Sequence, residues 1–300
     1  MPDSRAQAYA EQLDALTRAA EALTPEAQKR ILALLEAARR EIVADLAGVD
    51  PKSYSAARLQ ALKAQVDRVM GEFASQASSQ VEKIQEQAWT ESARSIDAAV
   101  AAGTARLAAS PVLDRSALQV IQGYTADLIG GISRDAAAKI VASIQRAYLG
   151  GSDLTQLVNQ IGGARYGSEW TGLFGQAGRK TVDVAMNEIM RVNSVASMAR
   201  INDLAERHPT LGKGWRHIPV AHVPRISHIL ANGQVRKPSE PFDVGGEQLM
   251  YPRDPSGSPE NTIFCHCLMY PALAAEDLQP TDRERDLLKS LGISVVPNGP

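Results

Sequence analysis

The chain of 300 residues carries 32 basic and 34 acidic side chains, which give it a formal net charge of −2. Apolar residues make up 44% of the chain and aromatic residues 5%, so global disorder is disfavoured and closely packed helices are favoured over a large β-sandwich. The balanced charge gives no support to nucleic-acid wrapping as the main role, and we expect neither a secretory signal nor a membrane span, because no long apolar run occurs.

The first part of the chain has apolar residues at helical spacing. Thr24, Pro25 and Glu26 predict the start of a helix, because a hydroxyl N-cap, a proline at the first helical position and an acid in the first turn form a start signal. This helix is expected to end before Pro51. A longer helix is predicted over about 54–109, where apolar residues alternate spacings of three and four, as is typical of a coiled-coil or bundle seam.

Four further helices follow in the predicted order. Two lie over about 114–129 and 133–150, with Asp114 and Ser133 as their N-caps. A short one begins at Ser152 and ends at Gly162, and a long one covers about 178–207, each with apolar residues along one face. The first two hundred residues are therefore expected to be almost entirely helical.

The composition changes after Pro209, where proline and glycine become frequent. Asn232 and Gly233 predict a two-residue hairpin turn between short apolar stretches. A capping box that begins at Thr281 predicts a last helix. These signals indicate a small region of short strands, turns and helices.

The predicted fold class is mostly α: an N-terminal bundle of long helices followed by a small, loop-rich α+β C-terminal module. We divide the chain into a helical N-terminal region over 1–130, a second helical part over 131–208, and a small α+β module rich in cysteine and histidine over 209–300.

Both cysteines and all five histidines fall between residues 208 and 267. Thiolate and imidazole are good zinc ligands, and a loop-rich module gains stability from a metal cross-link. The candidate ligands for a structural zinc ion are Cys265, Cys267, His228 and His266. The alternative is that the thiols are simply buried and the histidines form hydrogen bonds near the surface.

A metal-dependent nuclease is a second alternative, since such enzymes activate water at a divalent ion held by histidine and asparagine side chains. The residues available for this are His222, His228, Asn232, Asn261 and His266. No carboxylate is adjacent to any of these histidines, and the chain has no nucleophile elbow, Walker A motif or dinucleotide fingerprint. We therefore expect no enzyme activity.

An ordered set of motif residues spans the last third of the chain: Trp215, Arg225, Ser227, His228, Asn232, Gly233, Phe242, Asp254, Asn261, Cys265 and Cys267. This order resembles the head morphogenesis domain of the phage Mu F-like minor head protein family, and the likeness covers about residues 133–270. The family pattern ends in Cys-Arg-Cys, whereas this chain has His266 at the middle position.

The resemblance implies a minor capsid protein of a tailed phage or prophage, assembled in the host cytoplasm and located in the virion head at the portal vertex. It implies the portal protein and the major capsid protein as partners, several copies per head, an influence on packaged DNA or its ejection, and no membrane association. About thirty residues follow Cys267, and we expect them to form one helix rather than an appended enzyme domain.

The residues themselves also indicate association between proteins, because long amphipathic helices suit helix-to-helix contacts. The predicted interaction residues are a seam on the longest helix and a set of anchors in the C-terminal module: Val66, Val69 and Phe73, and Trp215, Arg225 and Phe242. Two other classes stay open, namely a DNA-handling enzyme and a free effector protein.

Overall fold

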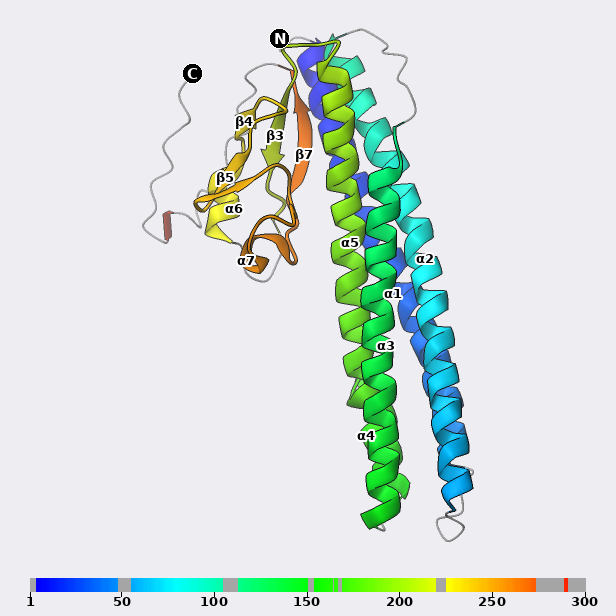
Figure 1. Cartoon of the computed structure of the whole chain (residues 1–300). Coiled ribbons are helices and arrows are strands. Elements are labelled where there is room, and N and C mark those ends of the chain that lie inside the picture. Colours follow the sequence, from blue (N-terminus) through cyan, green and yellow to red (C-terminus); the bar gives the residue numbers. More distant parts are fainter. Residues whose placement is uncertain are drawn as a thin grey trace. The chain divides into compact units, whose positions relative to one another are not determined.

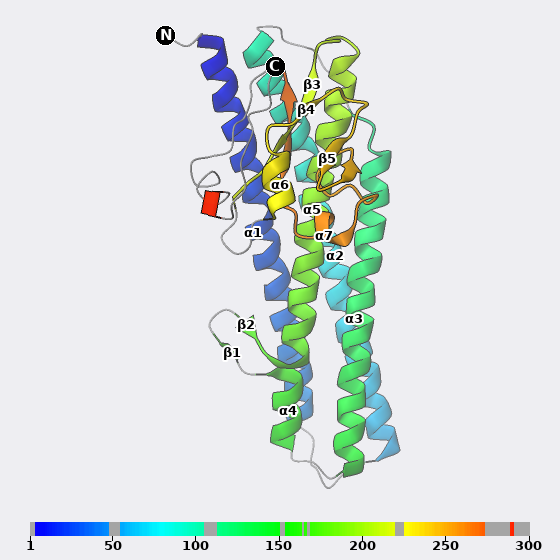
Figure 2. The same cartoon turned by 90° about the vertical axis from the view of Figure 1, so that its left-hand side faces the viewer.

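A computed structural model describes residues 4–47, 55–104, 113–150, 154–163, 165–166, 169–219, 225–273 and 289–290. The chain is mostly helical, with a small α+β region near its C-terminal end, as the sequence predicts (Figures 1 and 2). None of the helices in the described ranges combines the length and apolarity needed to cross a membrane.

Contacts divide the chain into two compact units that interleave along the sequence. We call residues 24–84 and 119–188 the helical unit, and residues 1–23, 85–118 and 189–300 the mixed unit. The sequence analysis divides the chain consecutively instead, at 130 and 208. The difference arises because a long helix can contribute its two halves to different cores.

Four long helices each contribute residues to both units. A short helix and a two-stranded hairpin lie between the third and fourth of them in the described sequence. These elements are α1 (Ser4–Ala47), α2 (Ala56–Thr104), α3 (Ser116–Gly150), α5 (Gly172–Ala205), α4 (Leu154–Gly162), β1 (Arg165–Tyr166) and β2 (Glu169–Trp170). In the helical unit, the Ser133 hydroxyl of α3 donates to the Met70 carbonyl of α2, and Arg68 of α2 pairs with Glu41 of α1.

Two predicted helix starts are wrong. Pro25 lies inside α1, which already begins at Ser4. Its ring faces solvent while Leu23 and Ala27 on either side are buried, so packing keeps the helix continuous despite the lost backbone hydrogen bond. Ser133 likewise lies inside α3 and uses its hydroxyl for a contact with a neighbouring helix rather than as a cap.

Asp114 is confirmed as a capping residue, because its Oδ1 accepts hydrogen bonds from the backbone N and the hydroxyl of Ser116, at 3.0 and 2.8 Å. The predicted seam of the longest helix is also confirmed as a buried stripe. Val66, Val69 and Phe73 are each at most 3% exposed, so the chain itself covers this seam.

The C-terminal module of the mixed unit is built on a three-stranded antiparallel sheet in the order β4-β3-β7. Its elements are β3 (Gly212–Arg216), α6 (Ile226–Ala231), β4 (Val235–Arg236), β5 (Phe242–Val244), β6 (Glu247–Leu249), α7 (Pro259–Thr262) and β7 (Leu268–Ala272). Strands β5 and β6 form a separate hairpin. At Gly214 of β3 only a glycine fits, because an added Cβ would lie 2.0 Å from the ring of Tyr270.

The module packs on the parts of α1, α2 and α5 that belong to the same unit. Its core joins Trp215, Phe242 and Leu268 to apolar residues of those helices such as Leu16 and Ile201. The predicted hairpin at Asn232-Gly233 is half right: Gly233 has a φ of 82° and forms a turn, but the stretch before it is helix α6 rather than a strand. The predicted last helix begins at Thr281, outside the described residues.

Candidate metal centre

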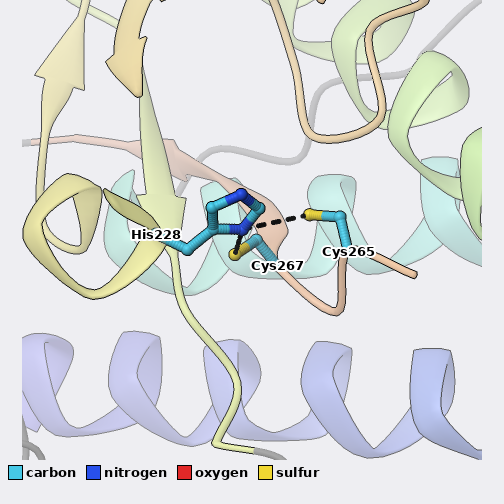
Figure 3. A group of neighbouring side chains, drawn as sticks. All are labelled: His228, Cys265 and Cys267. Carbon is cyan, nitrogen blue, oxygen red and sulfur yellow. Dashed lines mark hydrogen bonds between the residues drawn. The ribbon is translucent and has the colours of Figure 1, made fainter. Parts of the chain in front are cut away.

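Three side chains from two segments of the module meet inside its core (Figure 3). His228 lies on α6, Cys265 follows α7, and Cys267 directly precedes β7. The Nδ1 atom of His228 lies 3.6 Å from Sγ of Cys265 and 3.3 Å from Sγ of Cys267, and the three potential ligand atoms all lie within 4.8 Å of one another. All three side chains are buried, and neither cysteine forms a disulfide.

The local chain direction explains which of the predicted ligands meet. Residues 265–267 lead into β7, and alternate residues of an extended chain face opposite sides. Cys265 and Cys267 therefore point into the core, whereas His266 between them is exposed. Within the described residues, His266 is not part of the group that could hold a metal ion, so its prediction as a ligand is corrected.

Trp215 forms one wall of the site. Its ring meets the His228 ring edge to face, with centroids 6.0 Å apart, and meets the Phe242 ring at 5.3 Å. Both Trp215 and Phe242 are completely buried. The sequence analysis assigned these two residues to partner anchoring, but the structure places them in the core beside the cysteine and histidine group.

Arg253 provides a buried positive charge next to the cysteines. Its backbone has a φ of 67°, in the left-handed region, and its side chain is 1% exposed. The Nη1 atom donates to the Cys267 carbonyl at 3.0 Å and to the Ser194 hydroxyl of α5 at 3.3 Å. The sequence analysis missed this role, since an arginine within a Pro-Arg-Asp-Pro loop carries no signal that it is buried.

The two thiols have opposite pKa shifts. Burial raises the pKa of Cys267 well above its ordinary value, and the neighbouring Cys265 adds to this. For Cys265, burial also acts upward, but the hydrogen bond with Cys267 and the charge of Arg253 outweigh it and bring its pKa well below the ordinary value. One thiolate is therefore stabilised in the buried pair.

Polar side chains considered for a nuclease form hydrogen bonds with the backbone of the module. The Asn232 Oδ1 atom accepts a hydrogen bond from the His217 backbone, and Asn261 Nδ2 donates to the Val244 carbonyl. Asp254 accepts from the Met250 and Ser256 backbone N–H groups and so fixes a loop. His222 lies outside the described residues.

Arg225 binds within the module rather than presenting a free cation. Its Nη2 atom donates to the Ile263 carbonyl, and this connects the start of α6 to the turn after α7. With two sulfurs and one imidazole nitrogen, and no carboxylate among the described residues of the group, the arrangement offers the donor set that zinc prefers.

Comparison with known proteins adds a partial likeness. The chain is 31% identical over 101 residues to a protein of Bacillus subtilis (strain 168) named "Uncharacterized protein YqbB". The similar region covers 33% of this chain, and the chain spans about a third of the length of that relative. No family model matches the chain, and no solved structure matches it.

Proposed function

We propose that this chain is a minor capsid, or head morphogenesis, protein of a tailed phage or prophage. It associates with the portal and the major capsid protein during head assembly and influences the packaging or ejection of DNA. The single observation that carries this proposal is the spatial convergence of the residues on which the resemblance to the Mu F-like family rests.

These motif residues are separated along the chain but interact within one small module. Trp215 contacts His228, whose ring faces both cysteines. Ser227 beside it hydrogen-bonds Asn261 at 3.3 Å. Such contacts are what a family signature that maintains one fold is expected to make.

The hydrogen bonds that these polar side chains form support a structural role over a catalytic one. The amides of Asn232 and Asn261 and the carboxylate of Asp254 all bind the backbone of nearby loops. A hydrolytic site needs such groups directed at a substrate or at a metal-bound water. In the described part of the module they maintain the fold instead.

Exposed apolar side chains supply surfaces for association. Ile226 and Leu230 are exposed on α6, and Ile263 and Phe264 are exposed in the turn that Arg225 connects to that helix. Exposed large apolar side chains favour contacts between proteins. We therefore assign the contact with the head structure to the exposed side of α6, which carries Ile226 and Leu230.

The test is co-expression of this chain with the portal and major capsid proteins encoded by the same genome, followed by sedimentation. The proposal predicts that the chain sediments with portal rings or procapsids at a fixed ratio. If it stays in the soluble fraction, the proposed role is wrong, and assays for DNA cleavage and for salt-dependent DNA binding then decide whether it is a DNA-handling protein.

Matched surface variants locate the contact. Replacing Ile226 and Leu230 with serine is expected to lower incorporation into heads while thermal unfolding stays unchanged, because both side chains are exposed. The control replaces Val120 and Tyr124, an exposed apolar pair at the same spacing on α3 of the helical unit. If only the control pair lowers incorporation, the contact lies on the helical unit.

A further inference from the structure

We propose that His228, Cys265 and Cys267 bind one zinc ion, which connects α6 to the segment between α7 and β7. This goes beyond the proposed role in head assembly and does not depend on it. The inference rests on the spacing of the three ligand atoms, on their chemistry and on their position in the module.

The two sulfur-to-nitrogen spacings are those of a tetrahedral zinc site. Zn–S bonds of about 2.3 Å and Zn–N bonds of about 2.0–2.1 Å at tetrahedral angles place sulfur and nitrogen about 3.6 Å apart. The two sulfur-to-Nδ1 distances are 3.6 and 3.3 Å. One ion between the three atoms therefore matches both sulfur-to-nitrogen distances, and the two sulfurs lie within 4.8 Å of each other.

Hydrogen bonding alone satisfies this group poorly. The Nδ1 atom of His228 has one lone pair or one hydrogen, yet two sulfurs face it at similar distances (Figure 3). The other ring nitrogen, Nε2, is buried and has no hydrogen-bond partner in the described structure. A single cation explains why both sulfurs converge on one nitrogen, because a metal ion interacts with all of its ligands at once.

The donor atoms select the metal. Calcium and magnesium require oxygen ligands, and the described group contains none. Two thiolates and one imidazole are borderline-soft donors that suit zinc, and together with Zn²⁺ the two thiolates give a site with no net charge. Arg253, bonded to the Cys267 carbonyl, acts as a positioning residue for that ligand.

The module has a structural use for such a cross-link. Its strands are two to five residues long, and α6 and α7 have six and four residues. Elements this short form few backbone hydrogen bonds, and small loop-rich units depend on metals or disulfides to compensate. The ion joins two segments that are 37–39 residues apart in sequence.

The test measures metal in the full chain purified under reducing conditions. We expect about one zinc per chain by mass spectrometry of the metal content, and a sulfur-to-cobalt charge-transfer band when Co²⁺ replaces zinc. Cys265→Ser, Cys267→Ser and His228→Asn should each weaken zinc binding by more than about 100-fold, beyond the 10–100-fold loss typical of removing an outer-shell partner. The matched control is His266→Gln, which should bind zinc like the wild type.

A variant that fails to fold would leave the ligand assignment undecided, so the wild type is tested as well. The reaction of its two thiols with a maleimide should be slow with zinc bound and at least about tenfold faster after a chelator removes it. Absence of zinc and of the cobalt band, or a Cys265–Cys267 disulfide in the purified protein, would overturn the proposal. An equal loss in His266→Gln would overturn the ligand set. Sedimentation with capsid proteins is a separate measurement, so either proposal can fail alone.

Discussion

The helical unit and the C-terminal module are stabilised in different ways. Buried side chains of the helical unit, such as Ile42, Val66 and Phe73, are mostly apolar and recur at helical spacing, and Glu188 is a charged exception. In the module, fully buried Lys213 and Arg253 lie in the core among apolar residues. One region buries a continuous apolar stripe, and the other depends on individual polar and charged groups.

This difference determines how strongly a single substitution lowers the stability of each region. An apolar stripe spreads stability over many contacts, so the cost of a substitution follows the apolar volume that is removed. A buried charge instead concentrates stability in a few hydrogen bonds, and removing one partner leaves another group unsatisfied.

Phe73 should show that volume governs the helical unit. We expect Phe73→Ala to lower the free energy of unfolding by about 3–5 kcal/mol, because a completely buried ring is replaced by a cavity. Phe73→Leu, which keeps most of the volume, should cost less than about 1.5 kcal/mol. Chemical denaturation followed by far-UV circular dichroism measures both, with exposed Glu72→Ala as control. Equal costs for alanine and leucine would contradict a volume-governed core.

Arg253 should show that hydrogen bonding governs the module. Arg253→Met keeps much of the side-chain volume but leaves the Cys267 carbonyl and the Ser194 hydroxyl without this donor. We expect a loss of about 2–4 kcal/mol, seen as faster hydrogen exchange in peptides that contain β3 and β7. Arg207→Met, which removes an exposed ion pair with Asp203, is the control. If both variants exchange like the wild type, the buried guanidinium is dispensable.

The helices were predictable because their signal is local and repeated. The stripe that contains Val66, Val69 and Phe73 follows from spacing alone. The helix starts assigned to Pro25 and Ser133 were wrong, because burial of the surrounding stripe outweighs a local start signal. A capping pattern shows that a helix can begin at a given residue. It does not show that the turn before that residue is non-helical.

The site was predictable only in part. Cys265, Cys267 and His228 were recognised by their chemistry, but their meeting depends on contacts between residues almost forty positions apart. His266 is a good ligand by its chemistry alone, but alternation along the chain turns it outward. The burial of Arg253 has no local signal, since it is set by α5 and β7 packing around it.

Lys213 gives the module a pH dependence. Burial lowers the pKa of this lysine from 10.5 to about 8, although the charges of Asp254 and Glu240 act in the opposite direction. Its ammonium donates to the Met250 carbonyl and lies 5.0 Å from the centre of the Phe242 ring. Because the folded-state pKa is the lower one, the unfolded chain binds more protons between pH 8 and 10.5, and stability rises with pH across that window.

The size of this effect can be isolated from other titrating groups. We expect the free energy of unfolding to gain about 1–3 kcal/mol between pH 8 and 10 from Lys213, less than the full shift implies because the charged form can relax. The quantity to measure is the pH slope of wild type minus that of Lys213→Met. This difference removes the contribution of every titrating group that the two proteins share. A zero difference would show that Lys213 keeps its ordinary pKa in the folded chain.

Two buried serines on long helices test the contrast between the two regions with the smallest expected changes in stability. Ser133 donates to a carbonyl in the interior of α2, which also has its own helical partner, so Ser133→Ala leaves no group unsatisfied. Alanine is also the better helix former, and the net change in the free energy of unfolding should lie within about 0.5 kcal/mol.

Ser194 accepts a hydrogen bond from Arg253, so Ser194→Ala removes an acceptor from a buried guanidinium and should cost about 1–2 kcal/mol of stability. Hydrogen exchange of peptides from α3 and from β7 reports each loss locally. Equal costs at the two positions would mean that buried charge does not set the two regions apart.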